Sequence, residues 1–309
     1  SAMKAPERQT QQLRRHYSRE ERRGWLCGYL FIAPLLVGLL IFYIIPFIQS
    51  ICYSFTDIDS FNNATFIGLA NYKQMFSDPE MWSSFGNTLL WVVVTVPIGI
   101  LISLFIATLL NMNIKGKSGY RTFYFLPVVT MPAAIAMVWK WIYNGQFGVL
   151  NQILGVFGLP ARDWVTDPSI AFWMVMIVGI WSSVGYNMVI LLAGMQGISS
   201  SYYEVAAIEG ANVGQQFFKV TLPLLTPTLF FVLLTSIISG FQVFDIIYMM
   251  IGKGSPAYEA TQTILMLYYR NAFDYSYKGY ASAIAVFLFV VILIITVIQM
   301  KLQKKWVNY

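Results

Sequence analysis

Six stretches of this sequence are long, apolar and almost free of charge, and they restrict the possible folds more than any other feature. They lie near residues 26–50, 87–110, 122–143, 170–195, 224–250 and 280–300, and each contains at most one charged side chain. Each is about as long as the ~20 residues that a helix needs to cross ~30 Å of hydrocarbon. We therefore predict six transmembrane helices.

The composition excludes a soluble protein of this size. Hydrophobic residues make up 57% of the 309 residues, and charged residues make up only 11%. An ordinary soluble domain has about 25% charged residues, and without them the polar surface that must cover a core is missing. The predicted fold class is therefore all-α, in a polytopic membrane protein.

The basic residues predict the orientation, because cytoplasmic loops of membrane proteins carry an excess of Lys and Arg. An even number of spans puts both ends of the chain on one side. If that side is the cytoplasm, the inside segments hold 14 basic residues and the outside segments hold 6. We therefore predict an N-in, C-in topology.

This topology divides the chain into three parts. Residues 1–24 form a basic cytoplasmic tail, 25–301 form the membrane domain with a cytoplasmic loop at 197–223, and 302–309 form a second cytoplasmic tail. Ser1 and Ala2, ahead of Met3, are interpreted as a cloning remnant. The arginines of the first tail are expected to meet the membrane lipid.

The reactive residues exclude several function classes. The single histidine, His16, lies in the polar tail, and Cys27 and Cys52 would lie about 37 Å apart along a helix. We therefore expect no disulfide, no metal site and no enzymatic activity on this chain. Lys115–Ser118 contains Gly-Lys-Ser, but Asn111 stands where a phosphate-binding loop needs glycine, so no cofactor is expected. The net charge of +6 is concentrated in the tails, and nucleic-acid binding is not expected.

The most informative segment is the inside loop before the fifth predicted span. Ser201 and Glu204 have the spacing of a capping box, which predicts that a helix begins there. Gly210 is expected to end this helix, because glycine adopts the left-handed conformation cheaply. A second short helical stretch follows, and Pro223 is expected to open the fifth span. Small residues along the first helix favour close docking of another protein, and the alternative is a surface helix that touches only its own chain.

The same loop resembles the EAA loop of the permease subunits of ABC importers. That family's pattern is matched here by Glu204-Val205-Ala206, then Gly210, nine further residues, and Val220-Thr221-Leu222-Pro223. Val205 and Val220 depart mildly from the pattern. Other segments resemble the carbohydrate branch of the family, similar to maltose and glycerol-phosphate permeases: Gly68–Tyr72, Asn87–Leu89, Tyr120–Phe123, Leu192–Gln196 and Phe244–Tyr248.

The resemblance implies a type I ABC importer permease fold in a bacterial inner or plasma membrane. It also implies three kinds of partner: a second homologous permease subunit, two ATP-binding subunits that carry ATP and Mg, and an extracellular solute-binding protein that delivers a sugar or oligosaccharide. The residues that it assigns to ATPase coupling are Glu204, Ala206, Ala207, Glu209, Gly210 and Ala211.

A sugar pathway needs polar side chains beside aromatic rings, because a sugar has many hydroxyls and apolar ring faces. The fourth and fifth predicted spans supply such residues: Tyr186, Asn187, Ser236, Gly240, Gln242, Asp245 and Tyr248. Asp245 is the one acid clearly inside a predicted span, where a charge is costly and usually functional. It could instead anchor the outer end of the helix, and each of the other polar residues could serve as an interhelical hydrogen bond.

Three other functions compete with this prediction. An ion-coupled secondary transporter of a small polar solute would need several acids within its spans, and an intramembrane enzyme would need clustered His, Cys or carboxylate groups. Neither pattern is present in the predicted spans. A membrane scaffold without transport activity is not excluded by any feature of the sequence.

Overall fold

The computed structural model describes residues 19–58, 63–112 and 114–306, so most of the predicted N-terminal tail and the end of the C-terminal tail lie outside the described residues. The chain forms two compact units, residues 1–50 and 51–309. Each is described by itself.

The first unit is built on one long helix. It consists of α1 (Arg19–Leu39), a π-helical turn η1 (Leu40–Ile44) and α2 (Ile45–Ser54), which continues into the second unit. The apolar part runs over 28 residues, Cys27–Ser54, four residues beyond the predicted end at residue 50. Pro46 is the second residue of α2, just beyond the π-turn, and a wider turn is one way in which a helix accommodates the N–H that proline lacks.

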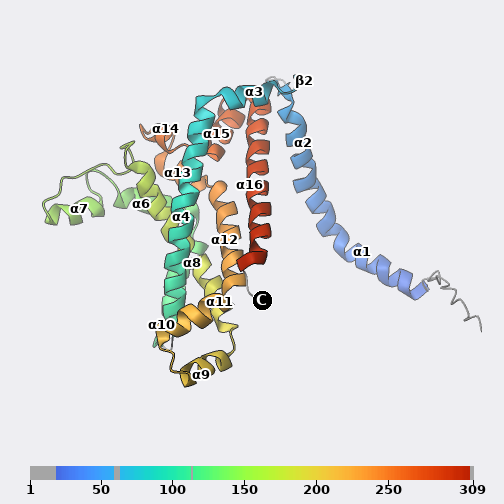
Figure 1. Cartoon of the computed structure of the whole chain (residues 1–309). Helices are drawn as coiled ribbons and strands as arrows, with labels where there is room; N and C mark the ends of the chain where they lie inside the picture. Colours follow the sequence, from blue (N-terminus) through green and yellow to red (C-terminus); the bar gives the residue numbers. More distant parts are fainter. Residues whose placement is uncertain (1–18, 59–62, 113, 307–309) are drawn as a thin grey trace, which may run out of the picture. The chain divides into compact units, whose positions relative to one another are not determined.

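The second unit begins with a short hairpin and continues as helices (Figure 1). Strands β1 (Thr56–Ile58) and β2 (Ala64–Phe66) pair antiparallel, with Asp57 opposite Thr65. This hairpin is the one departure from the predicted all-α fold among the described residues. The helices that follow are α3 (Ala70–Ser77), α4 (Pro79–Asn111), α5 (Lys117–Val129), α6 (Pro132–Ile142), α7 (Val149–Val156), α8 (Ala171–Gln196), α9 (Ser200–Ile208), α10 (Val213–Gln216), η2 (Phe217–Thr221), α11 (Leu222–Leu224), α12 (Thr226–Phe241), α13 (Asp245–Ile251), α14 (Tyr258–Thr261), α15 (Ile264–Tyr269), η3 (Arg270–Asp274) and α16 (Lys278–Trp306).

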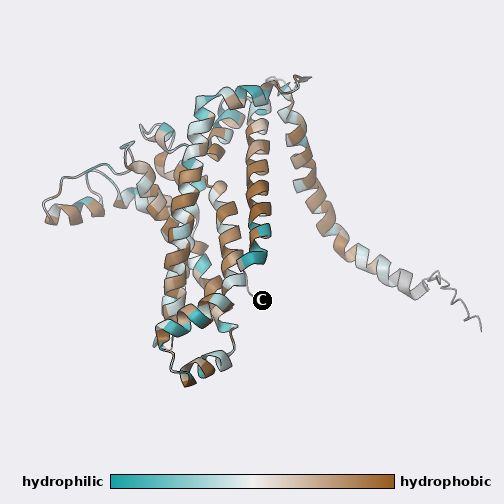
Figure 2. Cartoon of the chain, viewed as in Figure 1, coloured by the Kyte–Doolittle hydropathy of each residue, from teal (hydrophilic) through white to brown (hydrophobic). Residues whose placement is uncertain are grey.

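Within the described residues, four helices are long and apolar enough to cross a membrane without interruption. They are the 28-residue helix of the first unit, α4, α8 and α16. Two further pairs qualify only as bent spans, α5 with α6 at 101° and the segment Val213–Leu224 with α12 at 66°. The predicted number of six spans therefore corresponds to the upper count, in which each bent pair is one span. Figure 2 shows the long helices as mostly apolar.

The predicted span over 122–143 is a bent pair rather than one straight helix, because α5 and α6 are separated at Thr130 and Met131. Pro132 opens α6, and it holds Met131 in an extended conformation, with φ −60° and ψ 134°. The predicted helix over 224–250 is also interrupted. Pro223 lies inside the short α11, near the end of the helical segment Val213–Leu224, and does not open the span as predicted. The membrane helix α12 begins at Thr226 and ends at Phe241, before the separate α13.

Small residues bring α4, α5 and α8 close together. A Cβ atom added at Gly179 would lie 2.6 Å from the ring of Trp91, and one added at Gly185 would lie 2.2 Å from the backbone oxygen of Tyr124. Such close approaches are typical of membrane helices, which associate through packing rather than through exclusion of water.

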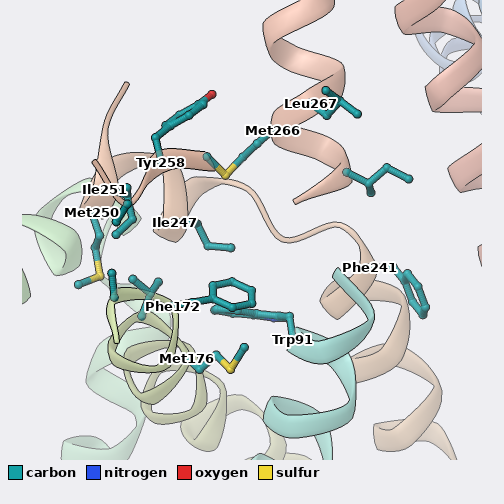
Figure 3. Close-up of a cluster of buried hydrophobic side chains, with 14 of the residues drawn as sticks. Trp91, Phe172, Met176, Phe241, Ile247, Met250, Ile251, Tyr258, Met266 and Leu267 are labelled. Atoms are coloured by element: carbon teal, nitrogen blue, oxygen red, sulfur yellow. The ribbon is translucent and has the colours of Figure 1, made fainter. Parts of the chain in front are cut away.

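The core lies between α4, α8, α13 and α15 (Figure 3). The rings of Trp91 and Phe172 are 6.0 Å apart between centroids, and Met176 and Ile247 are buried in the same cluster. A second apolar cluster joins α4, α8 and α12 nearer the α9 end and includes Leu110, Leu191 and Leu225. The two clusters fix the helices whose side chains form the site described next.

Candidate functional site

The segment with the coupling pattern forms a short helix, α9, at the end of the second unit opposite α3 (Figure 1). The predicted stop at Gly210 is confirmed, because Gly210 has a φ of +82°. Its N–H donates to the Ala207 oxygen at 3.0 Å, and the Ala211 N–H donates to the Ala206 oxygen at 2.9 Å. These two bonds satisfy carbonyls that the helix end leaves free.

The capping box predicted at Ser201 and Glu204 is wrong. The helix begins at Ser200, so Ser201 is already inside it, and its hydroxyl lies 2.9 Å from the Ser199 hydroxyl instead. The capping box of this segment lies at Asn212 and Gln215, where each side-chain oxygen accepts from the other residue's backbone N–H at 2.9 Å. The Asn-x-x-Gln spacing was the sequence signal for it.

The surface of α9 is largely open. Glu204, Ala207 and Glu209 are exposed, and Ala206 and Ala211 are half-buried. The apolar side chain of Ile208 is 87% exposed. One polar contact holds the helix to the neighbouring turn, between the Tyr203 and Thr221 hydroxyls at 3.0 Å. An exposed apolar side chain on a helix with few contacts to its own chain is typical of a docking surface. The coupling role of these residues stays a prediction.

A cavity of about 560 Å³ lies between α4, α8, α12 and the segment that begins α13. Its described lining contains hydroxyls, amides and aromatic rings but no charged side chain: Trp91, Thr95, Val96, Gly179, Ser182, Ser183, Tyr186, Asn187, Thr235, Ser236, Ile238, Ser239, Gly240, Val243 and Ile246. A mixed wall of this kind can hydrogen-bond a neutral, hydroxyl-rich solute and pack against its apolar faces.

Four of the seven predicted pathway residues line this cavity, namely Tyr186, Asn187, Ser236 and Gly240. The side chains of Asn187 and Ser236 face each other, with 3.5 Å between the Ser236 hydroxyl and the amide oxygen of Asn187. The structure therefore brings together the predicted residues of α8 and α12. Whether these residues contact a transported solute stays a prediction.

The other three predicted residues lie outside the cavity lining. Gln242 is exposed in the turn that ends α12, and Asp245 is exposed at the first residue of α13. Asp245 is therefore not inside a continuous helix as predicted, because the chain is non-helical between the two elements. The Tyr248 ring stacks on the Phe244 ring at 5.0 Å, beyond the cavity lining.

Several lining residues were missed by the sequence prediction, among them Trp91, Thr95 and the serines of α8 and α12. Their signal is a helical spacing of small and polar residues. Ser182 and Ser183 lie one turn before Tyr186 and Asn187, and Ser239 follows Thr235 by four residues. Residues at such spacing share one face of a helix.

Polar contacts hold residues 260–270 against the start of α4. The Asn87 amide donates to the backbone oxygens of Ala260 and Gln262 at 3.1 and 2.9 Å. Arg270 forms an ion pair with Glu80. Burial lowers the pKa of Arg270, but the hydrogen bond and the charge of Glu80 outweigh it and raise that pKa above its ordinary value. The Asn-Thr-Leu motif therefore has a structural role next to the cavity.

Comparison with known proteins decides the family. The family described as "Binding-protein-dependent transport system inner membrane component" matches residues 96–308. The chain belongs to this family. The resemblance to ABC importer permeases and the predicted membrane location are thereby confirmed.

Members of the family resemble the chain over nearly its whole length. The probable ABC transporter permease protein YesP of Bacillus subtilis is 39% identical over 94% of this chain and 95% of its own. The trehalose/maltose transport system permease protein MalF of Thermococcus litoralis is 33% identical over 90% and 93%. The sn-glycerol-3-phosphate transport system permease protein UgpA of Pectobacterium atrosepticum is 32% identical over 93% and 97%.

Solved structures confirm the permease fold. A chain of a bacterial ABC transporter for the import of the acidic polysaccharide alginate matches with a TM-score of 0.84, over 94% of this chain and 98% of that one, at 22% identity. A second structure of a bacterial alginate ABC transporter, in complex with an alginate pentasaccharide-bound periplasmic protein, matches with a TM-score of 0.83. At 22% identity, these structural matches show that the fold is shared.

Proposed function

We propose that this chain is one permease subunit of an ATP-driven importer for a sugar or oligosaccharide. The observation that carries this proposal is the connection between α9 and the cavity. Two walls of the cavity are α8 and α12, and the segment that joins them in the chain, residues 197–225, contains α9. Residues 197–199 link α9 directly to α8, and residues 209–225 lead from α9 to α12, so a force applied to α9 can reach both walls.

The energy source in this proposal is a pair of ATP-binding subunits that bind ATP and Mg and receive α9 in a surface groove. Residues Glu204–Ala211 supply a short helix with exposed acids and a tight end at Gly210. A second permease subunit completes the pathway, and an external solute-binding protein delivers the solute. The chain itself supplies no catalytic group in this scheme.

The chemistry of the cavity supports a saccharide as the solute. Trp91 and Tyr186 supply rings that can pack against apolar sugar faces, and Asn187 with the neighbouring serines can hydrogen-bond sugar hydroxyls. Relatives named for trehalose and maltose import agree with this class. An ion-coupled carrier is not favoured, because no carboxylate lies in the described lining of the cavity.

The proposal is tested by reconstituting the chain in proteoliposomes with its second permease, its ATP-binding subunits and its binding protein. We expect ATP-dependent uptake of at least one member of a panel containing maltose, trehalose, sn-glycerol 3-phosphate and alginate oligosaccharides. Uptake that proceeds without the ATP-binding subunits, driven by an ion gradient, would contradict the proposal and support the secondary transporter.

A charge reversal then tests the coupling helix. Glu204→Lys should abolish co-purification of the ATP-binding subunits and ATP-dependent uptake, because it places a positive charge on the exposed docking face. Glu259→Lys is the matched control, since Glu259 is also an exposed acid but lies in α14, away from α9. If both variants behaved like the wild type, the coupling assignment would be wrong.

A further inference from the structure

Four aromatic rings form a continuous series beside the first turn of α13, and we call them the aromatic platform: Phe244, Tyr248, Tyr269 and Phe273. Centroid distances are 5.0 Å from Phe244 to Tyr248, 5.3 Å from Tyr248 to Tyr269 and 4.9 Å from Tyr269 to Phe273. The rings come from three places in the chain, the start of α13, the end of α15 and η3. The first three rings are half-buried, and the last ring, Phe273, is 65% exposed.

Charged groups lie at the rim of the platform. The Lys253 ammonium forms an ion pair with Asp274 at 2.6 Å and lies 5.8 Å from the centre of the Tyr269 ring. Asp245, next to Phe244 in the chain, is exposed. These ionised groups beside the rings argue against a surface that faces lipid tails, since charges there are costly. Rings beside hydrogen-bonding groups are the combination that binds a sugar ring.

The platform and the cavity share one segment of the chain. Val243 and Ile246 line the cavity, whereas Phe244 and Tyr248, on the same short segment, carry the first two rings of the platform. The first ring, Phe244, therefore lies next in sequence to a cavity-lining residue, and the last ring, Phe273, is exposed. This shared segment favours a small solute on its way to the cavity over a partner protein as the occupant.

We propose that the aromatic platform is a receiving subsite for a pyranose ring of the imported saccharide. The sugar stacks on Phe273 and Tyr269 before it reaches the cavity, and Lys253 and Asp274 hydrogen-bond its hydroxyls. The inference rests on the proposed function, since it takes the cavity to be part of a saccharide pathway.

The test uses the complete reconstituted importer and the panel saccharide that the wild type transports. Uptake is measured against the concentration of sugar-loaded binding protein, so that the maximal rate and the KM for that protein are obtained separately. For Phe273→Ala we expect the maximal rate to fall about threefold to tenfold, the equivalent of one lost ring contact, with an unchanged KM. Phe273→Tyr keeps a ring and should restore the rate.

Phe157→Ala is the matched control, because Phe157 is 75% exposed but follows α7, outside the platform. It should leave uptake unchanged. A wild-type rate in Phe273→Ala would overturn the platform while leaving the proposed function intact. A raised KM with an unchanged maximal rate would also overturn it, because Phe273 would then contact the binding protein rather than the sugar. Failure of the wild type to transport any panel saccharide would overturn both proposals.

Discussion

Replacing Gly210 with valine should uncouple the permease from its ATP-binding subunits without unfolding the membrane domain. Gly210 has a φ of +82°, and nothing lies within 4 Å of a Cβ atom placed there. A side chain at this position therefore meets no neighbour, and the whole cost is strain of the left-handed backbone. That cost is about 1–2 kcal/mol for an ordinary residue, and it is higher for a β-branched one.

A cost of about 1–2 kcal/mol reduces the population of the native turn by about 5- to 30-fold relative to relaxed alternatives. Because that turn orients α9, the affinity for the ATP-binding subunits should fall by a similar factor. We expect a graded series in which glycine binds best, asparagine next, then alanine, then valine, since asparagine tolerates the left-handed region better than other residues. Affinity is measured by titrating the purified ATP-binding subunits onto the permease pair, and uptake is measured in proteoliposomes.

Gly214→Ala supplies the internal control. Gly214 lies in α10 of the same loop, and an added Cβ would make only an ordinary contact with the Asn212 side chain at 3.5 Å. Alanine also favours a helix more than glycine does. Unchanged affinity in Gly210→Val, or an equal loss in Gly214→Ala, would refute the reasoning that the backbone conformation at Gly210 positions the coupling helix.

Two further predictions concern the ion pairs near α4 and the platform. Glu80→Gln should destabilise the membrane domain by at most about 3 kcal/mol, because it leaves the half-buried Arg270 charge unpaired; a melting temperature equal to that of an exposed control, Glu259→Gln, would contradict this. The hydrogen bond to Asp274 raises the pKa of Lys253 above its ordinary value of 10.5. The ion pair should therefore stabilise the folded state fully below pH 10.5, and this stabilisation should be lost as the pH rises through the pKa of Lys253 in the folded state. The difference in melting temperature between wild type and Lys253→Gln should therefore stay constant from about pH 6 to 9, and a change within that range would argue against the ion pair.

The sequence predicted the features that depend on local chemistry. The end of α9 at Gly210 follows from the conformational freedom of one residue, and the membrane class follows from the length of the apolar stretches. The breaks between α5 and α6 and between α12 and α13 could not be placed from the sequence, because the hydropathy is continuous across them. A window over 122–143 cannot distinguish one straight helix from α5 and α6, although Pro132 was the visible warning.

The cavity was only partly predictable. Asn187 and Ser236 were found because amides and hydroxyls are rare in apolar spans. Ser182 and Ser183 were missed, because the face of α8 that lines the cavity is fixed by long-range packing against α4. The position of Asp245 at the start of a separate helix was not predicted for the same reason, since the break before it is not recorded in the hydropathy.

The interruption between α12 and α13 has a mechanical consequence. A continuous helix behaves as a stiff rod, so a tilt at one end displaces the other end by a comparable amount. Here residues 242–244 lack helical structure, and the Val243 carbonyl accepts a hydrogen bond from the Thr263 hydroxyl at 3.2 Å instead. We therefore expect a tilt of α12 that starts on the α9 side to change the chain angle at residues 242–244, next to the cavity, rather than to displace α13 by a comparable amount. The Asn87 amide holds residues 260–262 against α4, and the Thr263 hydroxyl binds the chain at Val243, so we expect the outer segment to stay in place while α12 changes its angle.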